Sequence, residues 1–299
     1  ELWPELRDEL QEQNGQSLGL EQEGGLHICL SQAEFDSRKE SLDLLRSHQN
    51  GRFSYEMLDR KALLDMQPDL GPDVVGGSWC PHDGHVNPLY LLRSLHDCLL
   101  KKGGSVIVDA KVSAITYQQS LFDVTSTKGR FYAPRLILAA GLGNRTLAPM
   151  VGLEQPVRPQ KGHILVTQKT DKLIKLPMTQ LRQTAEGSIM IGDSKEEVGF
   201  DISSSADVTA QIASRAQRTL PALKNQHIIR SWAALRVMSP DGNPIYDQSA
   251  SHPGAYAITC HSGVTLAAAH CFDLASDIEA GCLGIGLQPF SERRFHVPA

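Results

Sequence analysis

The chain has 299 residues, of which 41% are hydrophobic and 21% are charged, and its net charge is -5. This is the composition of a globular protein of about two domains, and the acidic balance argues against a nucleic-acid partner. The six cysteines form no C-x-x-C pair, and the sequence contains no apolar run long enough to span a bilayer. We therefore expect free thiols, a reducing and cytoplasmic location, and neither metal cluster nor membrane span.

Helices dominate the first hundred residues. Leu2, Leu6 and Leu10 share one face of a helix over residues 1–13. The apolar spacing predicts further helices over 32–47, 59–66 and 89–102, and a short strand over 26–30. Glycines at 103 and 104 end the last of these helices.

The pattern changes at Ser105. Four β-rich runs, at 105–110, 112–117, 121–127 and 129–133, predict a meander that leads into a strand over 136–140. Beyond it we expect strands over 162–168, 187–193, 227–235 and 255–260, and helices over 205–219 and 263–279. This mixture is typical of an α/β protein with several antiparallel stretches.

Glycine-rich RLILAAGLGN (135–144) is a candidate phosphate-binding turn, because Gly141-Leu142-Gly143 follows a strand and precedes a helix. The third glycine of a G-x-G-x-x-G motif falls on Thr146. No acidic residue lies about 20 positions further on to hold a ribose. The stretch alone is a weak signal.

Two short clusters carry reactive side chains. His82-Asp83-Gly84-His85 offers two metal-capable imidazoles without a third ligand nearby, which favours a polar loop before the next helix. Cys260-His261-Ser262 could supply a nucleophile, but no orienting carboxylate or nucleophile elbow accompanies it. Metal binding and hydrolysis are thus the less favoured interpretations.

Arg236 follows the apolar run 232–235 and precedes a turn, so its guanidinium could project from a rigid strand end toward a substrate carboxylate. A structural ion pair is the alternative. Small residues at 261–266 join a strand to a helix, where backbone N–H groups could face a negatively charged ligand. An ordinary turn is the alternative there.

Six segments follow one another in an informative order: GGLHICL (24–30), GHVNP (84–88), LILAAG (136–141), PVRPQKGHILVT (156–167), WAALRVMSPDGNPIYD (232–247) and HSGVTLAAA (261–269). This order resembles the D-amino-acid-oxidase-like flavoenzymes, in particular the branch with glycine oxidase, hydrogen cyanide synthase, opine oxidase and D-hydroxyproline dehydrogenase. The resemblance implies a mixed α/β fold. An FAD-binding domain (1–18, 83–156 and 239–299) is interleaved with a substrate domain (19–82 and 157–238) on a large, mostly antiparallel sheet flanked by helices.

The same resemblance implies an activity and a set of site residues. In this family flavin N5 accepts hydride from the carbon that bears the amine of a small amino or imino acid, which gives an imine. Arg236 and His261 correspond to catalytic positions, and Arg236, Gln180 and Arg182 to substrate-binding ones, Gln180 replacing a tyrosine of glycine oxidase. The implied FAD-binding residues are Val112, Ala140, Gly141, Ser262, Gly263, Val264, Thr265 and Leu266.

Three departures from the family accompany these matches. The N-terminal βαβ unit with its G-x-G-x-x-G is missing, the tryptophan common after A-x-G is replaced around 142–144, and Gln180 changes the substrate site. We therefore expect a fragment that holds FAD only when the missing segment is supplied, or alternatively a non-catalytic subunit that binds no FAD. HSGVTLAAA and PDGNPIYD resemble the heteromeric branch, so partner subunits of a dehydrogenase are expected.

Overall fold

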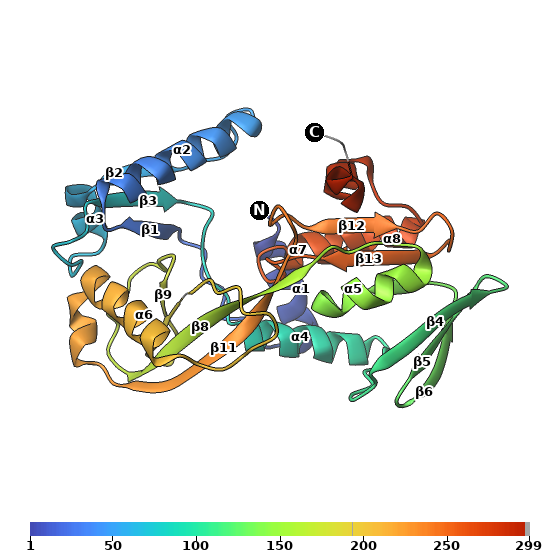
Figure 1. The fold of residues 1–299 in the computed structure, drawn as a ribbon. Coiled ribbons are helices and arrows are strands. Elements are labelled where there is room, and N and C mark those ends of the chain that lie inside the picture. Colours follow the sequence, from blue (N-terminus) through green and yellow to red (C-terminus); the bar gives the residue numbers. More distant parts are fainter. Residues whose placement is uncertain (193, 297–299) are drawn as a thin grey trace.

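The computed structural model describes residues 1–192 and 194–296 and has two halves connected by two long strands (Figure 1). The strands are β1 (Gly25–Cys29), β2 (Glu56–Asp59), β3 (Gly76–Cys80), β4 (Val112–Gln118), β5 (Leu121–Ser126), β6 (Gly129–Ala133), β7 (Leu136–Leu138), β8 (Arg158–Lys169), β9 (Leu181–Gln183), β10 (Ser188–Ile191), β11 (Ile228–Met238), β12 (Ile245–Gln248) and β13 (Ala255–Thr259). The α-helices are α1 (Trp3–Asn14), α2 (Gln32–His48), α3 (Arg60–Met66), α4 (Pro88–Lys101), α5 (Asn144–Leu147), α6 (Ala206–Thr219), α7 (Ala267–Ala269) and α8 (Ala275–Ala280). Short 3₁₀ turns are η1 (Gly141–Gly143), η2 (Ala148–Val151), η3 (Pro221–Asn225), η5 (Ile285–Phe290) and η6 (Glu292–Phe295), and η4 (His270–Leu274) is a π-helix.

One half is built on a large sheet. Its four-stranded part has the antiparallel order β11-β8-β10-β9, its three-stranded part has the order β1-β3-β2, and a parallel bridge between Leu26 and Met178 joins the two. Helix α6 packs on β8 and β10, whereas α2 and α3 pack on the smaller part. The buried side chains between these layers include Leu63, Leu165 and Ile189. The expectation of a mixed α/β fold with a large, mostly antiparallel sheet is confirmed.

The other half holds a small mixed sheet and a meander. Strand β13 pairs antiparallel with β12 and parallel with β7, while β4, β5 and β6 form a separate antiparallel sheet (Figure 1). Phe122 of the meander is fully buried with Leu138 and Val151. Helices α1 and α4 pack against each other beneath α7. Strands β8 and β11 run from this half into the large sheet.

Local sequence signals account for several helix starts. Ser31 Oγ accepts the Glu34 N–H at α2, Asp59 Oδ1 accepts the Ala62 N–H at α3, and Asn87 Oδ1 accepts the Leu89 N–H at α4. Each side chain satisfies a backbone donor that has no partner within its helix. None of the helices in the described ranges is both long and apolar enough to cross a membrane.

Two predicted elements are wrong. Residues 105–110 form no strand, because this extended segment pairs with no other strand of the described chain, and Val106, Ile107 and Val108 are exposed. The single helix expected over 263–279 begins only at Ala267 and contains the π-helix η4. Strands β2, β3, β9 and β12 were not predicted, because they are three to five residues long and depend on pairing with distant segments. Residue 193, at the end of the strand expected over 187–193, lies outside the described residues.

Asn144 joins the ends of β7 and β13. Its side chain is fully buried, and its amide nitrogen lies 3.0 Å from the carbonyl oxygens of Leu138 and Ile258 and 2.8 Å from Thr259 Oγ1. Its Oδ1 accepts the N–H of Ala140 at 3.0 Å. One side chain therefore provides hydrogen-bond partners for backbone groups at the ends of both strands, where the glycine-rich turn begins.

Asn144→Ala is expected to lower the free energy of unfolding by about 2–3 kcal/mol, because buried backbone groups lose their partners. Chemical denaturation followed by circular dichroism measures this change. The control is Arg145→Ala, which removes an exposed neighbour in the same short helix and should change stability little. Equal effects of the two substitutions would contradict the assigned role.

Candidate functional site

A pocket of about 580 Å³ lies between the two halves. It collects residues from α1, from the loop before α4, from β9 and β10, and from the segment after β13. The lining residues used below are Trp3, His85, Arg182, Met190, Val264 and Thr265. A concave site of this size that combines apolar walls with polar and charged side chains is typical of small-molecule binding.

Arg182 supplies the positive charge in this wall. It lies on β9 opposite Met190 of β10, and its guanidinium donates to the carbonyl oxygen of Val86 at 2.9 Å and contacts Met190 Sδ at 2.9 Å. Its side chain is half-buried, and within the described ranges it forms no salt bridge with a carboxylate. Burial lowers the pKa of Arg182, against the attraction of Glu186 and Glu21. A bound carboxylate would provide the missing partner.

His85 borders the same pocket and faces Glu21, whose Oε2 lies 3.4 Å from its Nε2. Burial lowers the pKa of His85, while Glu21 opposes this shift. His82, the other imidazole of the loop, accepts a hydrogen bond from Gln22 through its backbone carbonyl. The loop holds no group of three metal ligands among the residues that the structure describes.

The segment 261–266 forms the opposite side of the pocket through Val264 and Thr265. The Trp3 indole N–H donates to the Thr265 carbonyl at 3.1 Å, and His261 Nδ1 lies 3.2 Å from Ser262 Oγ. The Leu266 N–H donates a hydrogen bond to the Ser262 carbonyl oxygen. In the described part of the chain, the N–H groups of residues 263–265 donate no hydrogen bond. Three consecutive N–H groups that have no acceptor can bind the negatively charged edge of a ligand.

The neighbouring Cys260 does not have the properties of a nucleophile. Burial raises the pKa of its thiol, which lowers the fraction of thiolate at neutral pH. The imidazole of His261 contacts the hydroxyl of Ser262. We therefore do not favour hydrolysis.

Arg236 lies within β11 rather than in the loop after it, and it is half-buried. Its Nη1 donates to the carbonyl oxygens of Ser194 at 2.8 Å and Lys161 at 3.3 Å. The guanidinium covers Gly162, where a Cβ would lie only 2.4–2.5 Å from it. The glycine therefore makes room for the arginine, a relationship that no local sequence signal indicated.

The two arginines lie on one face of the large sheet. Arg182 pairs with Met190, and Met190 pairs with Val166 of β8. Side chains alternate along a strand, so Val166 and Gly162 share a face, and this is the face that Arg236 covers. Leu165 points to the opposite face and into the core.

Gln180 is turned away from this arrangement. Its Oε1 accepts a hydrogen bond from Arg215 Nε at 2.7 Å, and Arg215 pairs with both carboxylate oxygens of Glu34 at 2.8–2.9 Å. Gln180 lines a smaller pocket of about 280 Å³ beside α6. Of the three expected substrate residues, Arg182 alone lines the large pocket.

His27 lies next to this network, with its Nδ1 2.9 Å from Thr179 Oγ1. Burial, with repulsion from Arg38 and Arg215, lowers the pKa of His27 from 6.5 to about 4. The folded protein therefore keeps this imidazole neutral over a range in which the unfolded chain protonates it.

The free energy of unfolding is expected to fall as the pH drops from 6.5 to about 4, because the unfolded state binds the extra proton. His27→Gln removes the titrating group while its amide can still contact Thr179. Between pH 6.5 and about 4 the variant should lose on the order of 2 kcal/mol less free energy of unfolding than the wild type. Urea unfolding at each pH measures this difference. Parallel pH profiles would contradict the assignment.

The remaining cofactor candidates lie at the start of the meander and at the end of β7. Val112 is half-buried, whereas Ala140 is exposed beside η1. Gly141 has a φ of +57°, a conformation that glycine adopts without strain. The exposed, small residues leave space for a ligand along this strand end.

Comparisons with known proteins agree on one group. The family model described as FAD dependent oxidoreductase (DAO) matches residues 1–276. An opine oxidase subunit of Agrobacterium tumefaciens (strain Ach5) is 42% identical over 99% of this chain and 80% of that protein. The hydrogen cyanide synthase subunit HcnC of Pseudomonas protegens is 28% identical over 99% of this chain and 72% of that protein. The crystal structure of glycine oxidase from Geobacillus kaustophilus has a TM-score of 0.88 at 23% identity, covering 97% of this chain and 80% of that one.

Proposed function

We propose that this chain, which belongs to the DAO family of FAD dependent oxidoreductases, oxidises the carbon–nitrogen bond of a small amino or imino acid. The observation that carries the proposal is the half-buried Arg182 guanidinium in the wall of the 580 Å³ pocket. A partly desolvated cation without a carboxylate partner in the described chain favours a substrate that brings its own carboxylate. An amino or imino acid has this group beside the bond to be oxidised.

The relatives support the same class of substrate. A protein named as a subunit of opine oxidase shares 42% of its aligned residues with this chain. We propose that Arg182 and Arg236, on one face of the sheet, orient the substrate carboxylate, and that Gln180 acts indirectly through Arg215. His261 would contribute at the edge of the pocket, next to Ser262.

The residues present fit the family's cofactor, FAD. The N–H groups of residues 263–265 are suited to an anionic edge, and Ser262 and Leu266 flank them. Val112, Ala140 and Gly141 are proposed to contact the rest of the cofactor. Bound FAD supplies a hydride acceptor.

The chain's own residues would then bind the substrate and orient it. The arginines fix the carboxylate, and this fixes the position of the neighbouring C–H bond, which is a contribution of proximity rather than of acid–base chemistry. Met190 and Val264 provide apolar walls that exclude water from the reacting carbon. The substrate leaves as an imine, which hydrolyses in water.

We further propose that residues 1–18, 83–156 and 239–299 form the cofactor unit and that 19–82 and 157–238 form the substrate unit. Partner subunits are part of the proposal, since two of the relatives are named as subunits. Such partners would receive the electrons, whereas an oxidase would pass them to oxygen.

The test is reduction of bound flavin in the absence of oxygen, which does not depend on the electron acceptor. The purified chain, preceded by any natural upstream segment, is mixed with FAD and its visible absorption is recorded. We expect N-methylglycine or proline to bleach the flavin, and dimethylamine or pyrrolidine, which lack the carboxylate, to leave it oxidised. A flavin that is bound but reduced by neither type of amine would overturn the proposed reaction. A colourless protein that cannot be reconstituted would favour the non-catalytic alternative.

A further inference from the structure

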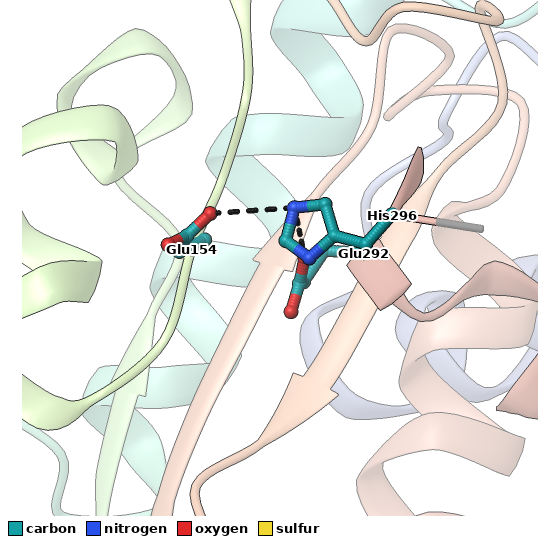
Figure 2. A group of neighbouring side chains, drawn as sticks. All are labelled: Glu154, Glu292 and His296. Atoms are coloured by element: carbon teal, nitrogen blue, oxygen red, sulfur yellow. Dashed lines mark ion pairs between the residues drawn. The ribbon is translucent and has the colours of Figure 1, made fainter. Parts of the chain in front are cut away.

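Three potential metal ligands, Glu154, Glu292 and His296, lie close together, and none of them lines the large pocket. Glu154 lies in the segment between η2 and β8, and Glu292 and His296 lie on and directly after η6. Their ligand atoms all lie within 4.8 Å of one another. Figure 2 shows His296 between the two carboxylates, with ion pairs to both Glu154 and Glu292.

Both ion pairs of His296 are long for charge-assisted hydrogen bonds. His296 Nε2 lies 3.5 Å from Glu154 Oε2 and 3.4 Å from Glu292 Oε2, whereas charge-assisted hydrogen bonds are about 2.7–2.9 Å long. A single imidazole N–H also cannot donate well to two carboxylates. Two ligands at about 2.0–2.1 Å from one tetrahedral Zn²⁺ lie about 3.3–3.4 Å apart, close to both distances from His296. The carboxylate oxygens of Glu154 and Glu292 lie within 4.8 Å of each other.

Glu292 also has an unmet requirement. Its Oε2 is buried and accepts no hydrogen bond from any residue of the described ranges, and 15% of its side chain is exposed. Buried carboxylate oxygens of this kind are normally paired or coordinate a metal.

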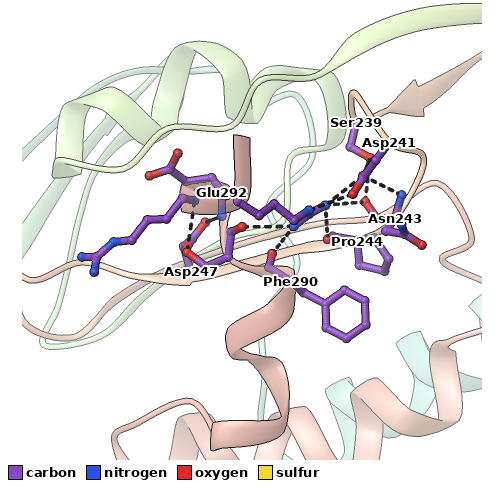
Figure 3. Close-up of polar contacts among 10 residues, drawn as sticks. Ser239, Asp241, Asn243, Pro244, Asp247, Phe290 and Glu292 are labelled. Atoms are coloured by element: carbon purple, nitrogen blue, oxygen red, sulfur yellow. Dashed lines mark hydrogen bonds and ion pairs between the residues drawn. The ribbon is translucent and has the colours of Figure 1, made fainter. Parts of the chain in front are cut away.

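The protein holds the two chain segments in place without a metal. Asp247 on β12 accepts hydrogen bonds from Ser291 Oγ at 2.7 Å, from the Glu292 N–H at 3.1 Å and from Gln155 Nε2 at 3.4 Å. Gln155 directly follows Glu154, so one carboxylate fixes both sources of ligands. Figure 3 shows Asp247 beside Glu292.

A second set of contacts fixes the turn. Arg294 donates to both carboxylate oxygens of Asp241 at 2.8 and 3.0 Å and to the carbonyls of Phe290 and Pro244. Arg294 therefore connects the start of this turn, at Phe290, to the loop that holds Asp241 and Pro244. Figure 3 shows Phe290, Asp241 and Pro244 in this network. A ligand set that is positioned in advance needs little reorganisation to bind.

The geometry points to a Zn²⁺ site formed by Glu154, Glu292 and His296, with water completing the coordination. One imidazole nitrogen and two carboxylate oxygens suit Zn²⁺ better than Ca²⁺, which takes six to eight oxygen ligands. The ion fastens the C-terminal turn to the segment before β8. This site is independent of the oxidoreductase reaction.

The experiment is a zinc titration of the purified, tag-free chain after chelator treatment, by calorimetry and by metal analysis. We expect one Zn²⁺ per chain and a rise in melting temperature. Glu154→Gln should weaken binding by about tenfold or more, and so should His296→Ala. Glu154 is 67% exposed, and the loss of one charge at its tip should leave the fold intact.

Matched controls are Glu40→Gln and His48→Ala, which change exposed side chains of α2 and should bind zinc like the wild type. All variants retain the same six cysteines, so binding by thiols cancels in the comparison. The inference is overturned if the wild type binds no zinc, if Glu154→Gln and His296→Ala bind it unchanged, or if Ca²⁺ binds as tightly as Zn²⁺.

Discussion

Arg182→Met is expected to lower kcat/KM for a carboxylate-bearing amine by about 100-fold, with Arg182→Lys falling in between. Methionine keeps an unbranched apolar side chain but removes the guanidinium that would pair with the substrate. The carboxylate then enters a half-buried wall whose described lining residues include no other lysine or arginine, and Arg236, which lies outside that lining, is too far along the sheet to replace the lost guanidinium contact. Anaerobic flavin reduction at several substrate concentrations measures the change.

A matched amine without a carboxylate separates this role from a structural one. Its rate of flavin reduction, although slow, should change little in Arg182→Met. Arg93→Met serves as the control, because Arg93 is 71% exposed on α4 and lies outside the pocket lining. A similar loss for both amines would show that Arg182 supports the pocket through Val86 and Met190 rather than through the substrate.

Local signals in the sequence were sufficient for the helices whose ends carry their own capping residues. Helix α4 begins at Pro88, one residue from the predicted start, because Asn87 caps it and proline is favoured in the first turn. Helix α2 agrees equally well, with Ser31 as its cap. In both helices the stabilising contacts lie within a few residues of each other.

Strand predictions depended on partners that the sequence does not identify. The run 105–110 is as apolar as the true strands, yet it remains outside the sheets of the described chain. The three residues of β9, by contrast, form a strand because β10 pairs with them. A strand is defined by its neighbour, so composition alone cannot separate these cases.

The pocket was the least predictable feature. Arg182 was identified only through a family resemblance, and its contacts with Val86 and Met190 join segments far apart in the chain. The space that Gly162 leaves for Arg236 is evident only once β8 and β11 are paired. Each of these relationships follows from strand register, which a single sequence does not specify.

The space beside Gly162 gives a second prediction with a large effect on activity. Gly162→Ala should lower kcat/KM for the carboxylate-bearing amine nearly as much as Arg236→Ala, which we expect to cost about 100-fold. A Cβ at residue 162 would lie 2.4–2.5 Å from the guanidinium, and the flexible arginine moves more easily than the sheet backbone. The guanidinium would then leave the position set by Ser194 and Lys161.

Because the added methyl displaces a side-chain end, Gly162→Ala should retain nearly the full free energy of unfolding while it loses activity. Gly286→Ala is the control, since a Cβ there meets no atom within 4 Å. The amine without a carboxylate should react with Gly162→Ala as it does with the wild type. Full activity of Gly162→Ala beside an inactive Arg236→Ala would mean that the arginine acts from another position, and equal losses for both amines would mean that it supports the sheet.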